Sequence, residues 1–179
     1  GDLVANAPHI PVHLGSMSAS IRAVIRHHGE DLQHGDAYVL NSPYDGGTHL
    51  PDVKVVVPVF HPAEGELLFF VAARGHHADI GGITPGSMPP NSTTVEEEGV
   101  LLDNLLLVRD GHFLEEEISA TLTNGPSPVR NLHQNLADLK AQVAANACGE
   151  RELRKMAEHF GLEVVQAYMG HVQDNAEEM

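Results

Sequence analysis

Residues 41–90 read NSPYDGGTHLPDVKVVVPVFHPAEGELLFFVAARGHHADIGGITPGSMPP, with two polar loops at the ends of an apolar stretch. The apolar part, VKVVVPVF (53–60) and LLFFVAA (67–73), predicts two strands joined by the turn HPAEGE. Because a hairpin brings its two outer ends together, we expect the loop before the first strand to lie beside the loop after the second. Both loops are rich in Gly and carry His and Asp, so the sequence predicts a functional site at that end of the hairpin.

The two predicted strands carry signs of their place in a sheet. Pro58 lacks a backbone N–H, which argues for an edge position or a bulge in the first strand. The second strand, LLFFVAA, is almost wholly apolar, and such a run is typical of a strand buried on both faces.

The rest of the sequence predicts a helix before this hairpin, a second hairpin after it, and helices in the last third. Residues 1–16 are loop-like, because Pro8 and Pro11 oppose a helix. In chain order the expected elements are a helix over 18–28 ended by Gly29, a strand over 36–40, a long loop over 81–95, strands over 100–108 and 112–116 joined by Asp110-Gly111, a helix from Asn131 to a stop at Gly149, a helix over 150–160 stopped by Gly161, and a helical stretch from Leu162. Segregated strands and helices predict an α+β fold, with antiparallel hairpins, flanking helices and a helical C-terminal third.

Length and composition predict a single globular domain over residues 1–179. Apolar residues make up 42% of the chain, an ordinary value for a folded protein with a core. The chain begins without Met in the turn-like GDLVANAP and ends inside a helical pattern that has no stop residue. We therefore expect this domain to be part of a larger one.

The charge of the chain disfavours several classes of partner. There are 10 Lys and Arg residues and the formal net charge is −15, so no basic surface is available for a nucleic acid or an anionic membrane. No apolar run has the length of a membrane span. The single cysteine, Cys148, cannot form an internal disulfide, which favours a reducing, cytoplasmic setting.

His49 and Asp52 form an H-x-x-D pair in the first loop, and Pro51 between them opposes a helix. Together with one histidine of the second loop they offer two imidazoles and a carboxylate. That set binds a divalent metal and leaves positions open for water or substrate. The alternative is that these are solvated polar residues of a loop.

His76 and His77 are adjacent, so on an extended segment their side chains point to opposite faces. One of them can bind the metal, while the other faces the substrate or makes a structural hydrogen bond. Asp79 can orient an imidazole or act as a general base, although capping of the following Gly-rich turn explains it equally well.

Two further positions complete the set of candidates. His9 and His13 lie in a proline-restrained loop and either form a positioned surface or make structural hydrogen bonds. Asp138 lies on a polar helix stripe, and such a stripe is usually the solvated side of a helix. Our catalytic candidates are His77, Asp79, His13 and Asp138.

Several nucleotide and hydrolase motifs are absent from the sequence. There is no G-x-x-x-x-G-K-[ST] phosphate loop, no G-x-G-x-x-G after a strand, and no G-x-S-x-G nucleophile elbow. Cys148 stands near a helix end with no pattern that marks a nucleophile. We therefore expect no ATP-binding site within this chain.

The sequence resembles the hydantoinase B/oxoprolinase family, in particular its 5-oxoprolinase branch. The segments that carry the resemblance cover nearly the whole chain: NAPHIPVHLGSM (6–17), GGTHLPDVKVVVPVF (46–60), ARGHHADIGGITPGSMPP (73–90), RNLHQNLADLKAQVAAN (130–146) and VVQAYMGHVQDNAEEM (164–179). Members of this family are longer at both ends.

The resemblance implies an ATP-coupled opening of a five-membered lactam or cyclic imide, such as 5-oxoproline to glutamate or a related hydantoin. In such systems a hydantoinase A-like subunit or domain binds ATP and phosphorylates the carbonyl oxygen, and the B-like half handles the activated species. An oligomeric assembly is expected. The related acetone carboxylases hold manganese through a His-x-x-Asp pair and a further His. By motif this gives His49, Asp52 and His76 as ligands of a divalent metal, manganese or zinc before others, and His76 is chosen because the second position of the pair varies more in the family.

Two alternatives stand beside this hypothesis. The chain could be part of an acetone carboxylase-like enzyme that carboxylates a small ketone, which a dependence on bicarbonate would reveal. It could also be a truncated module that binds its partner half without catalysing a reaction.

Overall fold

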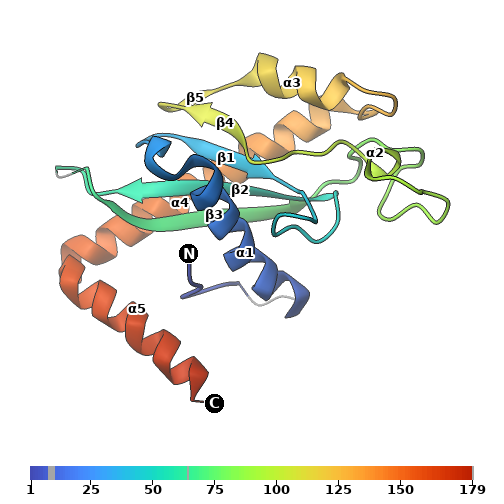
Figure 1. Ribbon diagram of the computed structural model, residues 1–179. Coiled ribbons are helices and arrows are strands. Elements are labelled where there is room, and N and C mark those ends of the chain that lie inside the picture. Colours follow the sequence, from blue (N-terminus) through green and yellow to red (C-terminus); the bar gives the residue numbers. More distant parts are fainter. Residues whose placement is uncertain (8–10, 64, 179) are drawn as a thin grey trace.

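The computed structural model describes residues 1–7, 11–63 and 65–178, apart from the side chain of residue 14. Figure 1 shows the elements, which follow the order α1 (Pro11–His28), the 3-10 turn η1 (Gly29–Asp31), β1 (Ala37–Leu40), β2 (Asp52–Phe60), β3 (Leu67–His76), α2 (Val95–Glu98), β4 (Leu105–Arg109), β5 (His112–Phe113), α3 (Glu115–Thr123), α4 (Leu132–Phe160) and α5 (Leu162–Glu177). The predicted α+β class, with antiparallel hairpins and a helical last third, is confirmed.

The sheet has five strands in the order β3-β2-β1-β4-β5, and every neighbouring pair is antiparallel. The predicted hairpin forms between β2 and β3, and its register places Asp52 opposite His76 and Lys54 opposite Arg74. The two polar loops therefore meet at one end of the hairpin, as the sequence predicts.

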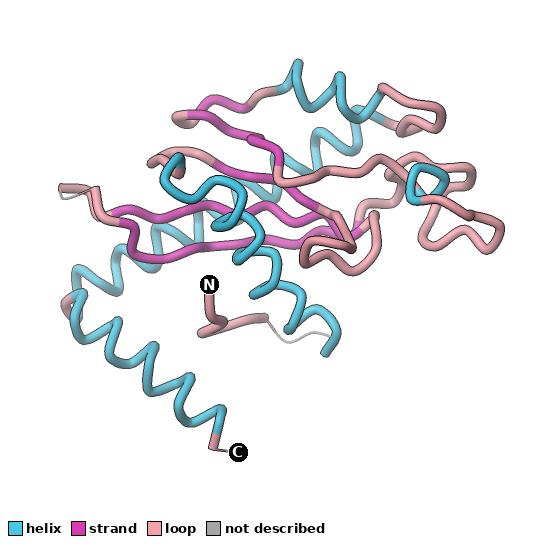
Figure 2. Tube along the Cα trace, in the orientation of Figure 1, coloured by secondary structure: helices cyan, strands magenta, loops and turns pink. Residues whose placement is uncertain are grey.

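A helix covers each face of the sheet, and Figure 2 shows α1 and α4 on its opposite sides. Strand alternation sends Val53 and Val55 into a core that includes Leu139 of α4, while Val56 packs into a second core with Val24 of α1. Asp52 and Lys54 have the same parity as Val56, so they lie on the α1 face.

The expectation that residues 67–73 form a strand buried on both faces is wrong. β3 is an edge strand, paired with β2 alone, and most of its residues are half-buried. Its apolar side chains contact helices on both faces of the sheet, which explains the apolar run, but the outer edge of the strand is open.

Pro58 lies in an interior strand, so the edge position is wrong for β2 as a whole. The last β2 residue paired with β1 is Val56, so Pro58 has no β1 partner that would need its N–H. The predicted irregularity does occur, since the β2–β3 register shifts between Val59 and Phe60.

The helices differ from expectation at three places. The predicted strand over 112–116 ends at Phe113, and the helix α3, which was not predicted, begins at Glu115. α1 begins at Pro11 rather than near residue 18, because proline at the first helical position sacrifices no intrahelical hydrogen bond. Gly149 does not stop a helix: α4 continues to Phe160, since one interior Gly costs only about 1 kcal/mol. Gly161 ends α4 as predicted, with φ at +89°.

The second hairpin forms at the predicted turn. Asp110 and Gly111 both have positive φ, 47° and 76°, as a two-residue turn between antiparallel strands requires.

Among the residues that the structure describes, no helix has the combined length and apolarity needed to cross a membrane.

Loop 41–51 is held by close backbone contacts that leave no room for a Cβ atom at Gly47. A Cβ there would lie 2.3 Å from the Ser42 carbonyl oxygen, and the Gly47 N–H donates to that same oxygen at 2.7 Å. We predict that Gly47→Ala lowers the free energy of unfolding by about 2 kcal/mol or more. Chemical denaturation of the two proteins measures this difference.

Gly170→Ala is the matched control, because a Cβ at Gly170 in α5 meets nothing within 4 Å. Alanine is the better helix former, so this variant should be stabilised by up to about 1 kcal/mol. Equal stability of the two variants would contradict the packing described for loop 41–51.

Candidate functional site

The candidate site forms where the hairpin register and loop 41–51 converge. Asp52 is the first residue of β2 and lies opposite His76, the last residue of β3. The loop that carries His49 is fixed by Asn41, whose Nδ2 donates to the carbonyls of Leu50 and Val100 at 2.9 and 3.0 Å. The predicted meeting of His49, Asp52 and His76 is thus produced by strand pairing and one buried amide.

One carboxylate oxygen of Asp52 faces two histidines. Oδ1 lies 2.8 Å from Nδ1 of His76 and 3.3 Å from Nε2 of His49. The two imidazole nitrogens are themselves 3.3 Å apart. These three atoms therefore form a compact triangle.

The other carboxylate oxygen of Asp52 is held by three neighbours. Oδ2 lies 3.0 Å from Nη1 of Arg74, 3.0 Å from Oγ1 of Thr48, and 3.2 Å from Nδ1 of His13. His13 is buried in the first turn of α1, so that helix seals this side of the carboxylate. The contacts fix the plane of the carboxyl group and direct Oδ1 toward the histidines.

Asp52 is ionised in this setting. Burial alone would raise its pKa, but hydrogen bonds from His76 and Thr48 and the nearby charges of His49 and Arg74 lower the pKa to about 2. The exposed fraction of the side chain rises from 1% at Asp52 to 23% at His49 and 52% at His76. The triangle is therefore anchored in the protein on one side and open to solvent on the other.

The geometry of the triangle fits a divalent metal. Ligand atoms of His49, Asp52 and His76 all lie within 4.8 Å of one another. A zinc-type ion about 2.0–2.2 Å from each ligand atom would hold such atoms about 3.0–3.5 Å apart, close to the separations found here. Two imidazoles and a carboxylate also leave coordination positions open.

A second group with suitable ligand atoms, His27, Asp45 and Asp103, lies at the surface. Its central carboxylate is already engaged, because Asp45 pairs with Arg26 and His27 and accepts a hydrogen bond from Asn104. The first group is therefore the better candidate.

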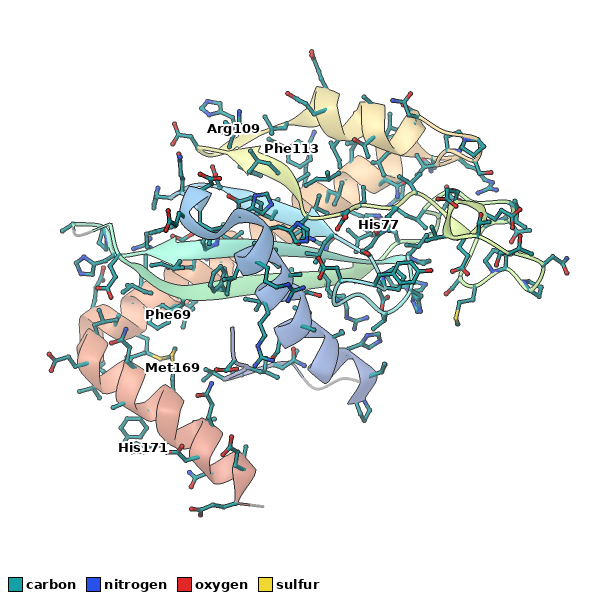
Figure 3. The ribbon with its side chains drawn as sticks, viewed as in Figure 1. Phe69, His77, Arg109, Phe113, Met169 and His171 are labelled. Atoms are coloured by element: carbon teal, nitrogen blue, oxygen red, sulfur yellow. The ribbon has the colours of Figure 1, made fainter. Side chains whose placement is uncertain are left out.

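His77 points to the opposite face of the sheet from His76, as the alternation along a strand predicts. It is buried, and its Nε2 lies 3.1 Å from Oε1 of Gln142 while its Nδ1 lies 3.0 Å from Nδ2 of Asn135. Both partners belong to α4. Burial lowers the pKa of His77, so the imidazole is neutral and joins β3 to α4 through two hydrogen bonds. Figure 3 labels His77 at the same end of the sheet as loop 41–51.

Asp79 and Asp138 make contacts away from the triangle. The Asp79 carboxylate accepts hydrogen bonds from the backbone N–H and Nη1 of Arg130, both at 2.6 Å, and Arg130 also donates to Gly82 O. Asp138 accepts from Gln134 Nε2 at 2.8 Å on α4, across the sheet from His76. Of the four catalytic candidates, His13 is the one that contacts Asp52. His9 lies outside the described residues.

Sequence reasoning missed two basic residues beside the triangle. Lys54 is completely buried, its Nζ donates to Gly46 O at 2.9 Å, and burial lowers its pKa to about 8. Arg74 contacts Asp52 from the neighbouring strand. Both positions could have been found from strand alternation, since Lys54 stands two residues after Asp52 and Arg74 two residues before His76.

Comparison with known proteins finds sequences and solved structures that are similar to this chain. The hydantoinase B/oxoprolinase family pattern matches residues 1–179. A 5-oxoprolinase from Dictyostelium discoideum is 50% identical over 177 residues, which cover 99% of this chain and 14% of that protein. The beta subunit of a caprolactamase from Pseudomonas jessenii is 31% identical over 98% of this chain and 29% of its own length.

Two solved structures resemble the fold. The crystal structure of ATP-dependent caprolactamase from Pseudomonas jessenii has a TM-score of 0.82 at 31% identity, and the match covers 94% of this chain and 28% of that one. A nucleotide-free acetone carboxylase has a TM-score of 0.72 at 22% identity, covering 88% and 20%, which shows a likeness of fold alone. The chain thus spans less than a third of each of these relatives.

The contacts of His76 and His77 predict losses of stability of different size in the metal-free protein. His77→Ala removes the hydrogen-bond donor to the buried Oε1 of Gln142 and one acceptor of Asn135 Nδ2, and the free energy of unfolding should fall by about 1–3 kcal/mol. His76→Ala removes a half-exposed side chain and should cost less than about 1 kcal/mol. Urea unfolding measures both, and a larger loss for His76→Ala would contradict this assignment.

The lowered pKa of His77 also predicts a pH dependence. Below the ordinary value of 6.5 the unfolded chain takes up a proton that the folded chain resists, so stability should fall as the pH drops below that value. His77→Gln lacks the titrating group and should show a shallower decrease between pH 7 and 5.

Proposed function

The chain belongs to the hydantoinase B/oxoprolinase family, and on that premise we propose that it is the metal-bearing part of an ATP-dependent enzyme that opens a cyclic amide. The observation that carries the proposal is the triangle of His49, Asp52 and His76 at the open end of the β2–β3 hairpin. The proposed substrate is 5-oxoproline, opened to glutamate, or a related hydantoin. The chain is 50% identical to a 5-oxoprolinase and 31% identical to the caprolactamase subunit, which favours 5-oxoproline as the substrate.

The proposed enzyme needs more than this chain. The chain spans 14% of the 5-oxoprolinase, which supports a role as one part of a larger domain. ATP is assigned to a hydantoinase A-like subunit or domain, because the chain has no phosphate loop and its net charge of −15 repels a polyanion. The caprolactamase relative is a beta subunit, which supports a partner of this kind and an oligomeric assembly. A cytoplasmic setting belongs to the same proposal.

Nε2 of His49, Oδ1 of Asp52 and Nδ1 of His76 would hold the metal, manganese or zinc before others. A metal in such a site acts as a Lewis acid on a carbonyl oxygen and lowers the pKa of bound water. The protein's own part is to keep Asp52 ionised and correctly turned, through the hydrogen bonds that Arg74 and Thr48 donate to Oδ2 and the close contact of His13 with the same oxygen.

The catalytic candidates take different parts in this proposal. His13 is the candidate for proton transfer, because its imidazole lies 3.2 Å from Oδ2 of Asp52. A catalytic role for His77 stays a prediction, and its hydrogen bonds to α4 support a role in holding β3 so that His76 faces Asp52. Asp79 and Asp138 stay predictions, and their contacts with Arg130 and Gln134 support positioning of the loop and helix near His77.

The metal assignment predicts a clear division between neighbouring residues. In the full-length protein purified with manganese or zinc, His49→Ala and His76→Ala should each lower bound metal to a small fraction of the wild-type content. His77→Gln should retain it, because His77 lies on the other face of the sheet. Elemental analysis after gel filtration gives the result, and loss of metal in His77→Gln with retention in His76→Ala would reverse the assignment.

The proposal that ATP binds to the hydantoinase A-like partner, and not to this chain, can be tested directly. Calorimetry with ATP should show no binding to this chain below millimolar concentration, whereas the chain together with an A-like partner should hydrolyse ATP when 5-oxoproline is added. Activity that depends on bicarbonate and a small ketone would favour a carboxylase instead. A protein that takes up no metal when metal is supplied, binds its partner and supports no turnover would favour a non-catalytic module.

A further inference from the structure

Two basic residues stand directly opposite each other beside the triangle. Lys54 of β2 pairs in register with Arg74 of β3, on the face that also carries Asp52 and His76. Like charges at opposed positions of neighbouring strands destabilise a sheet, and complete burial of the Lys54 side chain adds the loss of its hydration. An arrangement that costs stability in this way, next to a candidate site, calls for a functional reason.

The surroundings of this pair are unlike those of the other basic residues. The chain has 10 Lys and Arg residues against 25 Asp and Glu residues. Most of the other basic side chains have a carboxylate partner outside the triangle: Arg22 with Asp2, Arg26 with Asp45, Arg130 with Asp79, Lys140 with Glu115, Arg151 and Lys155 with Glu152, and Arg154 with Glu150. Lys54 instead donates to the Gly46 carbonyl, and Arg74 contacts the carboxylate that the histidines also use.

The result is a local excess of positive charge in a strongly acidic chain. Asp52 provides one negative charge against those of Lys54 and Arg74, which leaves one positive charge in excess before the histidines are counted. A divalent ion at the triangle would raise that excess to three, and an ion's own charge dominates the field of such a site. The triangle is exposed at His76, so an anion can approach it from solvent.

Arg74 has hydrogen-bonding capacity to spare. Its Nη1 donates to Oδ2 of Asp52 at 3.0 Å. Within the part of the chain that the structure describes, no hydrogen bond is formed by its Nη2 or Nε. A guanidinium group presents donors in a planar fork that matches a carboxylate or a phosphate.

We infer that Arg74, supported by the buried charge of Lys54, is an anion-binding subsite that takes the carboxylate group of the substrate beside the His49–Asp52–His76 triangle. The phosphate of an activated substrate has the same chemistry and is the second possible source of the anion. Arg74 makes the contact, while Lys54 acts through its charge and holds Gly46 and therefore the loop that leads to His49. The choice of a carboxylated cyclic amide rests on the proposed function.

The test uses the full-length, metal-loaded protein with its partner half and three probes. These are 5-oxoproline, which carries a carboxylate; 2-pyrrolidinone, the same ring without it; and inorganic phosphate. Calorimetry measures the affinity for each probe, and kinetics gives KM and kcat for the two lactams. Arg74→Gln is compared with Arg74→Lys and with the control Arg109→Gln. Arg109 is exposed and lies at the opposite end of the sheet from His77 in Figure 3.

We expect Arg74→Gln to weaken binding of 5-oxoproline by about 10- to 100-fold, the effect of losing a charge-assisted hydrogen-bonded pair. KM for 5-oxoproline should rise accordingly. Because Arg74 also donates to Oδ2 of Asp52, binding and turnover of 2-pyrrolidinone should fall as well, but by a clearly smaller factor, with the metal retained. Arg74→Lys should fall between, because an ammonium keeps the charge and loses the fork. Arg109→Gln should behave as wild type. Should Arg74→Gln fail to fold, Arg74→Lys decides by the same comparison of the two lactams.

Other outcomes distinguish the remaining explanations. A loss for phosphate without a loss for 5-oxoproline supports the subsite with phosphate as its anion. Equal losses for both lactams, or loss of the metal, would mean that Arg74 only orients Asp52, and the proposal is overturned. It is also overturned if the wild type binds neither anion. Anion binding that depends on Arg74 in a protein that opens no lactam would refute the proposed function while the subsite stands.

Discussion

The buried carboxylate of Asp52 is the interaction on which the candidate site depends. Its two oxygens are used differently: Oδ2 is held by Arg74, Thr48 and His13, and Oδ1 faces the exposed histidines. These neighbours come from β3, from the loop before β2 and from the first turn of α1. A single ionised group thus joins three separate segments, and a shift in any of them would turn Oδ1 away from His76.

The last residue of β3, His76, and the residue that follows it, His77, point to opposite faces of the sheet and have different contacts. His76 points toward α1 and solvent, while His77 points toward α4 and is bonded to Asn135 and Gln142. The same helix reaches further into the sheet, since Nε2 of Gln142 donates to Val53 O at 2.9 Å. β3 has no neighbouring strand on its outer side, so it is held there by α4, through the bonds at His77 and the bond from Nε2 of Gln142 to Ala73 O at 3.3 Å. Adjacent histidines can therefore be fixed structurally on one face and remain accessible on the other.

Sequence pattern predicted the hairpin, the meeting of its loops and the opposed directions of His76 and His77, because all three follow from strand geometry. It did not predict the start of α1 at Pro11 or the edge position of β3. An apolar run reports contact with helices on both faces of a sheet, and it carries no information about whether another strand pairs at the edge. Lys54 was missed for a related reason: one Lys within VKVVVPVF looks like a surface position until the register places it beside Asp52.

The exposure of the side chains increases from the buried, rigid part of the site to the part that a ligand can reach. Asp52 and Lys54 are almost inaccessible, Arg74 is 14% exposed, and His76 is 52% exposed. Buried polar groups keep the partners that folding gives them, because releasing one would strand a charge in a medium that solvates it poorly. Exposed groups can exchange water for a ligand at little cost. The positive charges of Lys54 and Arg74, which would attract an anion, are therefore fixed in the buried part of the site. The imidazole of His76, which would lie beside the bound anion, is at the solvent-exposed side.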